Sequence, residues 1–169
     1  MGLLLLPVFL YLLLSIPVRP VTKVPNEYKK SVLNYFPKGN DLFNRKISLL
    51  FVTNKNNQFI CLEEMIWFDQ LFDDKFSCYQ MLVYSLDAIF DDAEIDNNQL
   101  SSKVLVVKYV KPELFSLMKQ YISGDFFLLI DELGELRGVY LVDDEKARSQ
   151  AKTEIFILLQ NLEKCQKES

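Results

Sequence analysis

The stretch Phe127-Leu-Leu-Ile-Asp131-Glu-Leu-Gly134-Glu-Leu-Arg-Gly-Val-Tyr140 decides the fold of this chain. Two runs rich in apolar and aromatic residues flank a short polar turn, and Gly134 stands where such a turn needs a left-handed backbone. The pattern predicts a β-hairpin within Asp125–Val142. Everything upstream can be placed relative to this hairpin.

Two apolar runs before the hairpin predict two strands with a helix between them. Ile47–Val52 is a short continuous apolar run, typical of a strand buried on both faces, and Tyr79–Leu86 predicts the next strand. Asn57 is the candidate cap of a helix between them, which makes a βαβ unit with a right-handed crossover. The predicted apolar face of that helix consists of Leu62, Met65, Ile66, Phe68 and Phe72.

The remaining elements complete an α/β domain. Val104–Val110 predicts a third strand, and Pro112 opens a helix that ends at Gly124. After the hairpin, three acids at 143–145 favour the start of a terminal helix. Its apolar stripe is formed by Ala147, Ala151, Ile155, Leu158 and Leu162, widened by Phe156, Ile157 and Leu159. The expected fold is three-layered α/β, with a mostly parallel central sheet that ends in the antiparallel hairpin.

The N-terminus predicts a membrane anchor. Leu3–Val18 is almost entirely apolar, and as a helix it would span about 24 Å, against about 30 Å for the hydrocarbon core of a bilayer. We expect an uncleaved signal-anchor over residues 1–21, a tether over 22–45 and the folded domain over 46–169. Within the tether, a short amphipathic piece around Tyr28–Phe36 is expected to pack on the domain. A cleaved signal peptide, giving a secreted protein, is the alternative. By the positive-inside rule, the basic residues after the apolar run would place the part of the chain that follows it in the cytoplasm.

Composition excludes several classes of function. The chain of 169 residues has a net charge of −4 and no basic stripe, so nucleic-acid binding is not expected. It contains no histidine, which removes the commonest metal ligand and general base. Its three cysteines form no CxxC pair. We therefore predict no metal site, no cofactor and no dithiol redox centre.

The hairpin resembles a known family. The sequence from Phe127 to Tyr140 is similar to the F-x-L-I-D-x-x-G-x-I-R-G-x-Y hairpin of the Sco/SenC copper-handling proteins and related membrane-tethered thiol-disulfide proteins. Phe51-Val-Thr53 resembles the F-x-T that precedes their CPxxCP loop. The resemblance implies a thioredoxin-like fold over residues 46–164 and an extracytoplasmic, periplasmic location, opposite to the orientation that the basic residues favour.

The chain departs from that family at each chemical position. Lys55 and Phe59 stand where the resemblance would place the two cysteines. Ser123-Gly-Asp125 replaces both the copper-binding histidine and the cis-proline segment. No catalytic residue of the family can therefore be transferred to this chain, and we expect a redox-inactive module that binds or assembles with a protein partner.

Cys61 is the one candidate for remaining chemistry. In the first turn of its helix, the helix dipole would favour a thiolate, which would suit a monothiol oxidoreductase or redox sensor. We nevertheless expect a small, packed and inert cysteine on a helix face, with this thiol chemistry as the alternative. Cys61 and Cys78 are expected at opposite ends of the βαβ unit, too far apart for a disulfide, whereas Cys78 and Cys165 could approach each other.

Two further features have structural alternatives. The acidic stretch 87–98 lacks the glycine and glutamate of a calcium loop, so a solvated loop is expected. Four aromatic residues on the first helix exceed one apolar stripe and predict either core packing or a partly exposed protein contact: Phe59, Trp67, Phe68 and Phe72. An unrelated α+β lipid- or peptide-binding domain stays open if the hairpin does not lie at the edge of a mostly parallel sheet.

Overall fold

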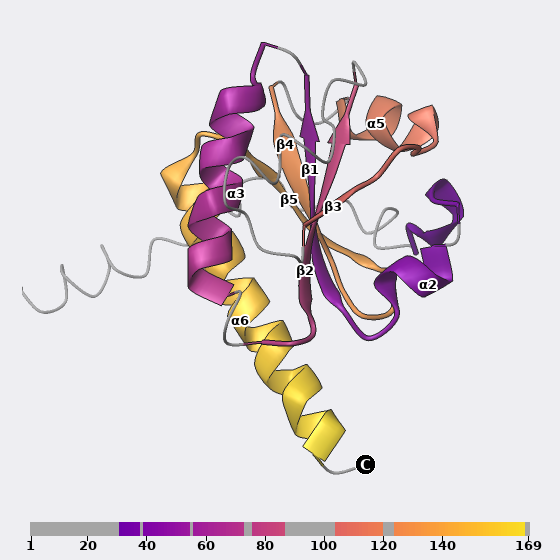
Figure 1. Cartoon of the computed structure of the whole chain (residues 1–169), viewed down its shortest axis with the longest axis vertical. Coiled ribbons are helices and arrows are strands. Elements are labelled where there is room, and N and C mark those ends of the chain that lie inside the picture. Colours follow the sequence, from indigo (N-terminus) through magenta and orange to yellow (C-terminus); the bar gives the residue numbers. More distant parts are fainter. Residues whose placement is uncertain are drawn as a thin grey trace, which may run out of the picture.

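The computed structural model describes residues 31–37, 39–54, 56–72, 76–86, 104–119 and 124–167. The described strands are β1 (Ile47–Thr53), β2 (Tyr79–Ser85), β3 (Val104–Val106), β4 (Phe126–Ile130) and β5 (Leu136–Leu141). The helices are the 3-10 turn η2 (Leu33–Tyr35), α2 (Gly39–Phe43), α3 (Gln58–Phe72), α5 (Pro112–Lys119) and α6 (Glu145–Lys167) (Figure 1). The expected anchor, Leu3–Val18, lies outside the described residues.

The strands form one sheet in the order β3-β2-β1-β4-β5. β1 pairs in parallel with β2, and β2 with β3, while β4 runs antiparallel to both β1 and β5. Only β4 therefore opposes the common direction. The predicted α/β sheet, its βαβ unit and its terminal hairpin are confirmed. Because the hairpin does lie at the edge of this sheet, the condition for an unrelated α+β domain is not met.

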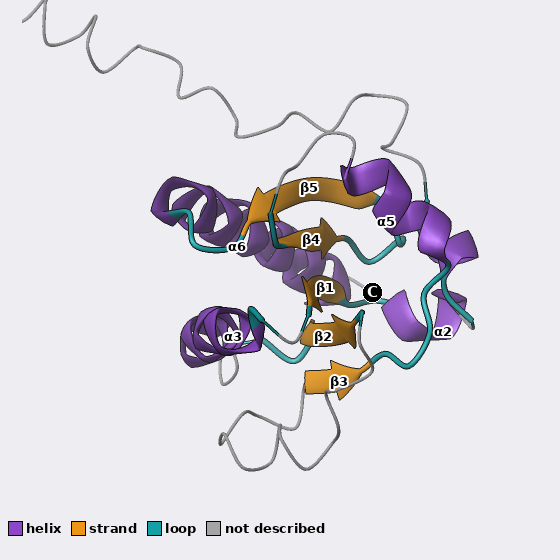
Figure 2. Cartoon of the chain, turned by 90° about the horizontal axis from the view of Figure 1, so that it is seen from above, coloured by secondary structure: helices purple, strands orange, loops and turns teal. Residues whose placement is uncertain are grey.

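Helices cover both faces of the sheet (Figure 2). α3 and α6 pack on one face, over alternate residues such as Leu49 and Met81. α2 and α5 cover the other face, over Leu50 and Leu82. Both faces of β1 are thus buried, which is why its sequence is continuously apolar rather than alternating.

The segment before β1 contributes to the second face. Val32, Phe36 and Phe43 are buried against the sheet, and the Phe36 and Phe43 rings meet edge to face at 5.0 Å. The buried Gln80 side chain donates a hydrogen bond to the carbonyl of Leu42 at 2.7 Å. The described part of the expected tether, 22–45, is therefore packed on the domain, because its apolar side chains find a sheet face to cover.

Some predicted faces and lengths differ from the structure. β3 ends at Val106 rather than Val110, since the chain turns away from the sheet and Lys111 N–H bonds to the Tyr35 carbonyl at 2.9 Å. In α3 the buried positions include Cys61 and Glu64, whereas two predicted core residues, Leu62 and Ile66, are only partly buried. In α6, Phe156 and Ile157 face solvent instead of widening the buried stripe.

Candidate functional site

The carboxyl ends of β1 and β2 meet the start of β4 at one edge of the domain, which we call the carboxyl edge. β1 ends at Thr53, whose carbonyl accepts the Leu86 N–H at 2.9 Å. Asn54 then turns the chain towards α3, because its side chain accepts the Asn56 N–H at 2.9 Å. Its amide also donates to Asp125, just before β4, at 3.3 Å. Hydrogen bonds thus link the end of β1 both to the end of β2 and to the residue before β4.

Cys61 lies beneath this edge as a buried thiol. Helix α3 begins at Gln58, directly after Asn57, so Cys61 does occupy its first turn as predicted. Its side chain is 0% exposed. Burial raises the pKa of Cys61 to about 12; the hydrogen bond with Thr53 lowers it, and the nearby carboxylates of Asp125 and Glu64 raise it further. Desolvation therefore outweighs the helix dipole, and the thiol is protonated at neutral pH.

Cys61 and Cys78, whose side chains the structure describes, form no disulfide with each other. Cys78 is buried, and neither it nor Cys61 is in a disulfide. The side chain of Cys165 lies outside the described residues, so its predicted approach to Cys78 stays a prediction.

Other residue types occupy the positions where the resemblance to Sco/SenC proteins would place the reactive groups. Phe59, at one cysteine position, is 69% exposed, while Lys55 and Ser123 lie outside the described residues. Gly124 has a positive φ of 123°, and no peptide bond in the described ranges is cis. Within the same ranges, no cluster of three or more acidic or cysteine side chains could hold a metal ion.

An ion pair between a buried acid and a partly exposed arginine joins α3 to α6. Glu64 is almost fully buried, and its Oε1 lies 3.2 Å from Arg148 Nη2. The Arg148 guanidinium also lies 5.2 Å from the centroid of the Trp67 ring. Burial raises the pKa of Glu64; Arg148 opposes this, and Asp143 and Glu63 add to it. We did not predict this pair from the sequence, although an acid on the face shared by Cys61 and Phe68 was a visible signal.

The aromatic residues of α3 differ in exposure, and Trp67 is partly buried. Phe68 and Phe72 are core residues, stacked with a centroid distance of 6.4 Å, so packing accounts for them. Phe59 faces solvent together with Ile60, 37% exposed, and Leu86, 40% exposed. Because these three residues follow the carboxyl ends of neighbouring strands, we call them the carboxyl-edge patch. Of the predicted aromatic surface, Phe59 is the most exposed residue and is accessible to a partner.

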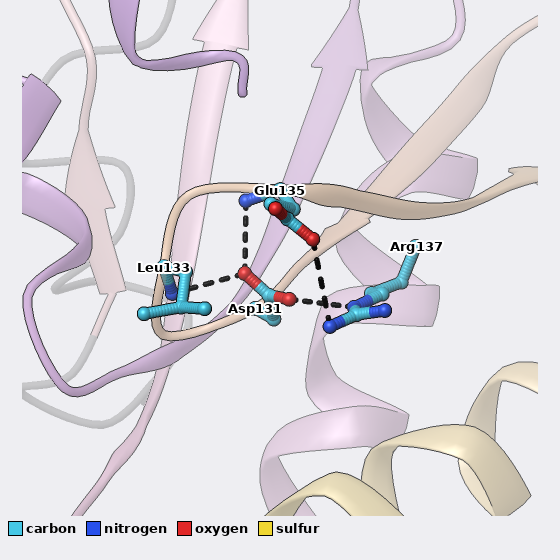
Figure 3. Close-up of polar contacts among 4 residues, drawn as sticks. All are labelled: Asp131, Leu133, Glu135 and Arg137. Atoms are coloured by element: carbon cyan, nitrogen blue, oxygen red, sulfur yellow. Dashed lines mark hydrogen bonds and ion pairs between the residues drawn. The ribbon is translucent and has the colours of Figure 1, made fainter. Parts of the chain in front are cut away.

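The hairpin contains a second polar centre with a purely structural role (Figure 3). Asp131 is 0% exposed, and its Oδ1 accepts the N–H groups of Leu133 at 2.9 Å and Glu135 at 2.8 Å. Its Oδ2 accepts the Nε–H of Arg137 at 2.5 Å. Gly134 has the predicted positive φ, 74°, and a Cβ there would lie 2.3 Å from Leu33. The conspicuous acid and arginine of this motif therefore fix the turn.

Comparisons with known proteins identify the fold. No family model matches the chain, and no curated protein is similar to it in sequence. A Chlorobium tepidum protein named as the thiol:disulfide interchange protein DsbE is 17% identical, with a TM-score of 0.52 over 70% of this chain and 84% of that one. A C-terminal domain named as a thiol-disulfide oxidoreductase, from Bacteroides thetaiotaomicron, is 16% identical, with a TM-score of 0.51 over 79% and 99%.

Yeast Sco1 is also similar, at 20% identity and a TM-score of 0.47 over 68% of this chain and 82% of that one. The DsbE and Bacteroides structures establish that this domain has a thioredoxin-like fold. The resemblance first seen in the hairpin is thereby confirmed at the level of the fold.

Proposed function

We propose that this chain is a membrane-tethered, redox-inactive thioredoxin-like domain that acts as a binding or assembly module. The observation that supports the proposal most is the state of the carboxyl edge. Its nearest thiol, Cys61, is fully buried with a pKa of about 12, while Phe59 beside it is 69% exposed. An edge with a protonated, inaccessible thiol and solvent-facing apolar groups suits binding better than electron transfer.

The carboxyl-edge patch is the proposed contact surface. The exposed apolar side chains of this patch are Phe59, Ile60 and Leu86. At the same edge, the Asn54 amide donates a hydrogen bond to Asp125. An aromatic side chain that becomes buried in a protein interface is a frequent source of binding energy. The partner is accordingly a protein that offers an apolar pocket or ridge.

The tether and the location are parts of the same proposal. We infer that Leu3–Val18 anchors the chain in a membrane and that the domain lies on the extracytoplasmic side, as the resemblance to Sco/SenC proteins implies. Within the described residues, no helix is both long and apolar enough to cross a bilayer. Fractionation of the intact protein, with protease added from one side of the membrane, tests both points.

Thiol chemistry is tested first, on the full chain in detergent micelles. We expect no reduction of insulin disulfides above the background of the reductant alone. Iodoacetamide should modify Cys61 only after unfolding, with Cys61→Ala as the matched control that reveals labelling of the other cysteines. Turnover that disappears in Cys61→Ala would establish the alternative, a monothiol oxidoreductase or redox sensor that uses Cys61.

Binding is tested by photo-crosslinking in native membranes. A benzoylphenylalanine replaces Phe59 in one variant and Phe156, an exposed phenylalanine on α6, in the control. We expect one discrete crosslinked product from position 59 and none from position 156. Products from position 156 alone, or from neither position, would contradict the carboxyl-edge patch as the contact surface.

A further inference from the structure

A hollow lies between β5 and α6, beside the hairpin turn. It has a volume of about 210 Å³ and is lined by Leu136, Arg137, Glu154, Ile157 and Leu158. Pockets that bind drug-sized molecules usually measure about 300–1,000 Å³, so this hollow has room only for a short chain of atoms. Most of its lining is aliphatic, and its two charged residues decide what such a chain has to carry.

The carboxylate of Glu154 is held at the hollow by uncharged groups. Gly138 leaves room for the Tyr140 ring, since a Cβ there would lie 2.3 Å from Tyr140 Oη. The Tyr140 hydroxyl donates to Glu154 Oε2 at 2.7 Å, and the Gln150 amide donates to Oε1 at 3.3 Å. Both donors orient the carboxylate without balancing its charge. Within the described part of the chain, no basic side chain forms an ion pair with Glu154.

The arginine at the hollow is already paired with acids. Arg137 Nε donates to Asp131 Oδ2 at 2.5 Å, and Arg137 Nη2 lies 3.7 Å from Glu135 Oε2 (Figure 3). One guanidinium thus faces two carboxylates, and the charge beside the hollow is negative even before Glu154 is counted. The electrostatics of the hollow therefore favour a cation and disfavour an anion.

We propose that this hollow binds a short primary alkylammonium group, with its stem against Ile157 and Leu158 and its charge at Glu154. An ammonium is a compact charge with three donors, and an ionised carboxylate has about four acceptor sites, of which Tyr140 and Gln150 use two. An aliphatic stem on an apolar surface with a charged end at a polar group is a favourable arrangement. The inference does not depend on the proposed function, because the hollow lies at the hairpin and the carboxyl-edge patch does not.

Titration of the full chain in detergent micelles with butylamine tests the site, with amide chemical shifts of β5 and α6 as the measurement. We expect saturable shifts with a Kd of about 1 mM, as suits a ligand of so few atoms. Butanol, which has the same stem and no charge, should bind at least about tenfold more weakly. Amides of β3 serve as the internal reference. Absence of a saturable shift, or equal binding of butanol, would overturn the proposal.

Two pairs of variants test the residues of the site. Glu154→Gln keeps an acceptor and removes the charge, whereas Glu145→Gln makes the same change at the exposed start of α6. We expect butylamine to bind about tenfold more weakly to the first and within about twofold to the second. Ile157→Trp should fill the hollow from an exposed position and abolish binding, and Phe156→Trp, whose side chain does not line it, should not. Equal affinities within either pair would overturn the proposal.

A lysine derivative distinguishes the two sources of an alkylammonium group, a free amine and a lysine side chain of another protein. Nα-acetyl-lysine methylamide carries the same ammonium on a stem that ends in peptide groups. Affinity equal to or above that of butylamine would support the site as one for a lysine side chain. Weaker affinity than that of butylamine would support it as a site for a free amine, and binding of neither compound would overturn it.

Discussion

The hairpin and the carboxyl edge lie at opposite ends of β4, and both carry polar residues, but their polar groups differ in purpose. At the hairpin, both carboxylate oxygens of Asp131 accept hydrogen bonds from the turn and from Arg137. At the carboxyl edge, Asn54 and Asp125 close a junction above a buried, protonated Cys61. The polar groups of the hairpin hold its turn, whereas those of the carboxyl edge link strand ends beside a buried thiol whose pKa is raised.

The difference shows that this sequence motif indicates the fold but not the function. The residues that link this sequence to thioredoxin-like proteins are those of the turn, and their contacts are local and structural. A conclusion about function has to come from the carboxyl edge, where solvent exposure and desolvation determine the accessibility and reactivity of the side chains. Substitutions in the two regions should therefore separate stability from binding.

The largest loss of stability is expected for Asp131→Ala. The substitution leaves the N–H groups of Leu133 and Glu135 without their acceptor and Arg137 without its buried partner. We expect the free energy of unfolding to fall by about 3 kcal/mol, measured by chemical denaturation of the full chain in micelles. Glu132→Ala, in the same turn, should change it by less than about 0.5 kcal/mol. Similar values for the two variants would contradict the structural role of Asp131.

A smaller loss is expected for Gly138→Ala. A Cβ at this position would lie 2.3 Å from Tyr140 Oη and 2.5 Å from its ring. The ring would have to move, breaking the hydrogen bond that Tyr140 donates to Glu154 at 2.7 Å. We expect a cost of about 2 kcal/mol. In a Tyr140→Ala background the same substitution should cost much less, and additive effects would show that the ring is not the obstacle.

Sequence reasoning captured the local and periodic parts of this fold. The hairpin follows from its turn residues, and the parallel pairing of β1 and β2 follows from two apolar runs separated by one helix. Packing of an amphipathic piece around Tyr28–Phe36 is predicted, and Val32 and Phe36 are indeed buried. Packing of Phe43 is not predicted, because it depends on contacts with strands far along the chain. The same holds for Glu64, whose partner Arg148 comes from the last helix.

The candidate site shows the limit more clearly. The position of Cys61 in the first turn of α3 was predicted, and the helix dipole alone would favour its thiolate. Its burial depends on how α3 packs against β1 in the core. Packing is the state that the sequence favours for this cysteine, but the completeness of its burial and the resulting rise of its pKa depend on the tertiary arrangement.

The pH dependence of stability tests the ion pair between α3 and α6. Because burial raises the pKa of Glu64, the folded protein binds the proton of this carboxyl more tightly than the unfolded chain does. Its contribution is therefore fully present below the ordinary glutamate pKa of 4.5 and is lost as the pH rises through the folded value. Relative to Glu64→Gln, the unaltered protein should lose free energy of unfolding between pH 4 and pH 7, measured by denaturation. A difference that is constant with pH would contradict this assignment.

The smallest effect on stability, and the sharpest test of the comparison, is expected for Phe59→Ser. The ring is 69% exposed and lies outside both core clusters, so its loss should change the free energy of unfolding by less than about 0.5 kcal/mol. Yet removal of an aromatic anchor from an interface often costs more than about 2 kcal/mol of binding, or roughly thirtyfold in affinity. Phe156→Ser provides the matched control, and affinity for the partner captured by crosslinking is the measurement. Unfolding of Phe59→Ser would show that Phe59 is needed for stability. Equal affinity of Phe59→Ser and Phe156→Ser for the partner would show that Phe59 does not contribute to binding. Either result would contradict the assignment of binding to the carboxyl edge and of stability to the hairpin.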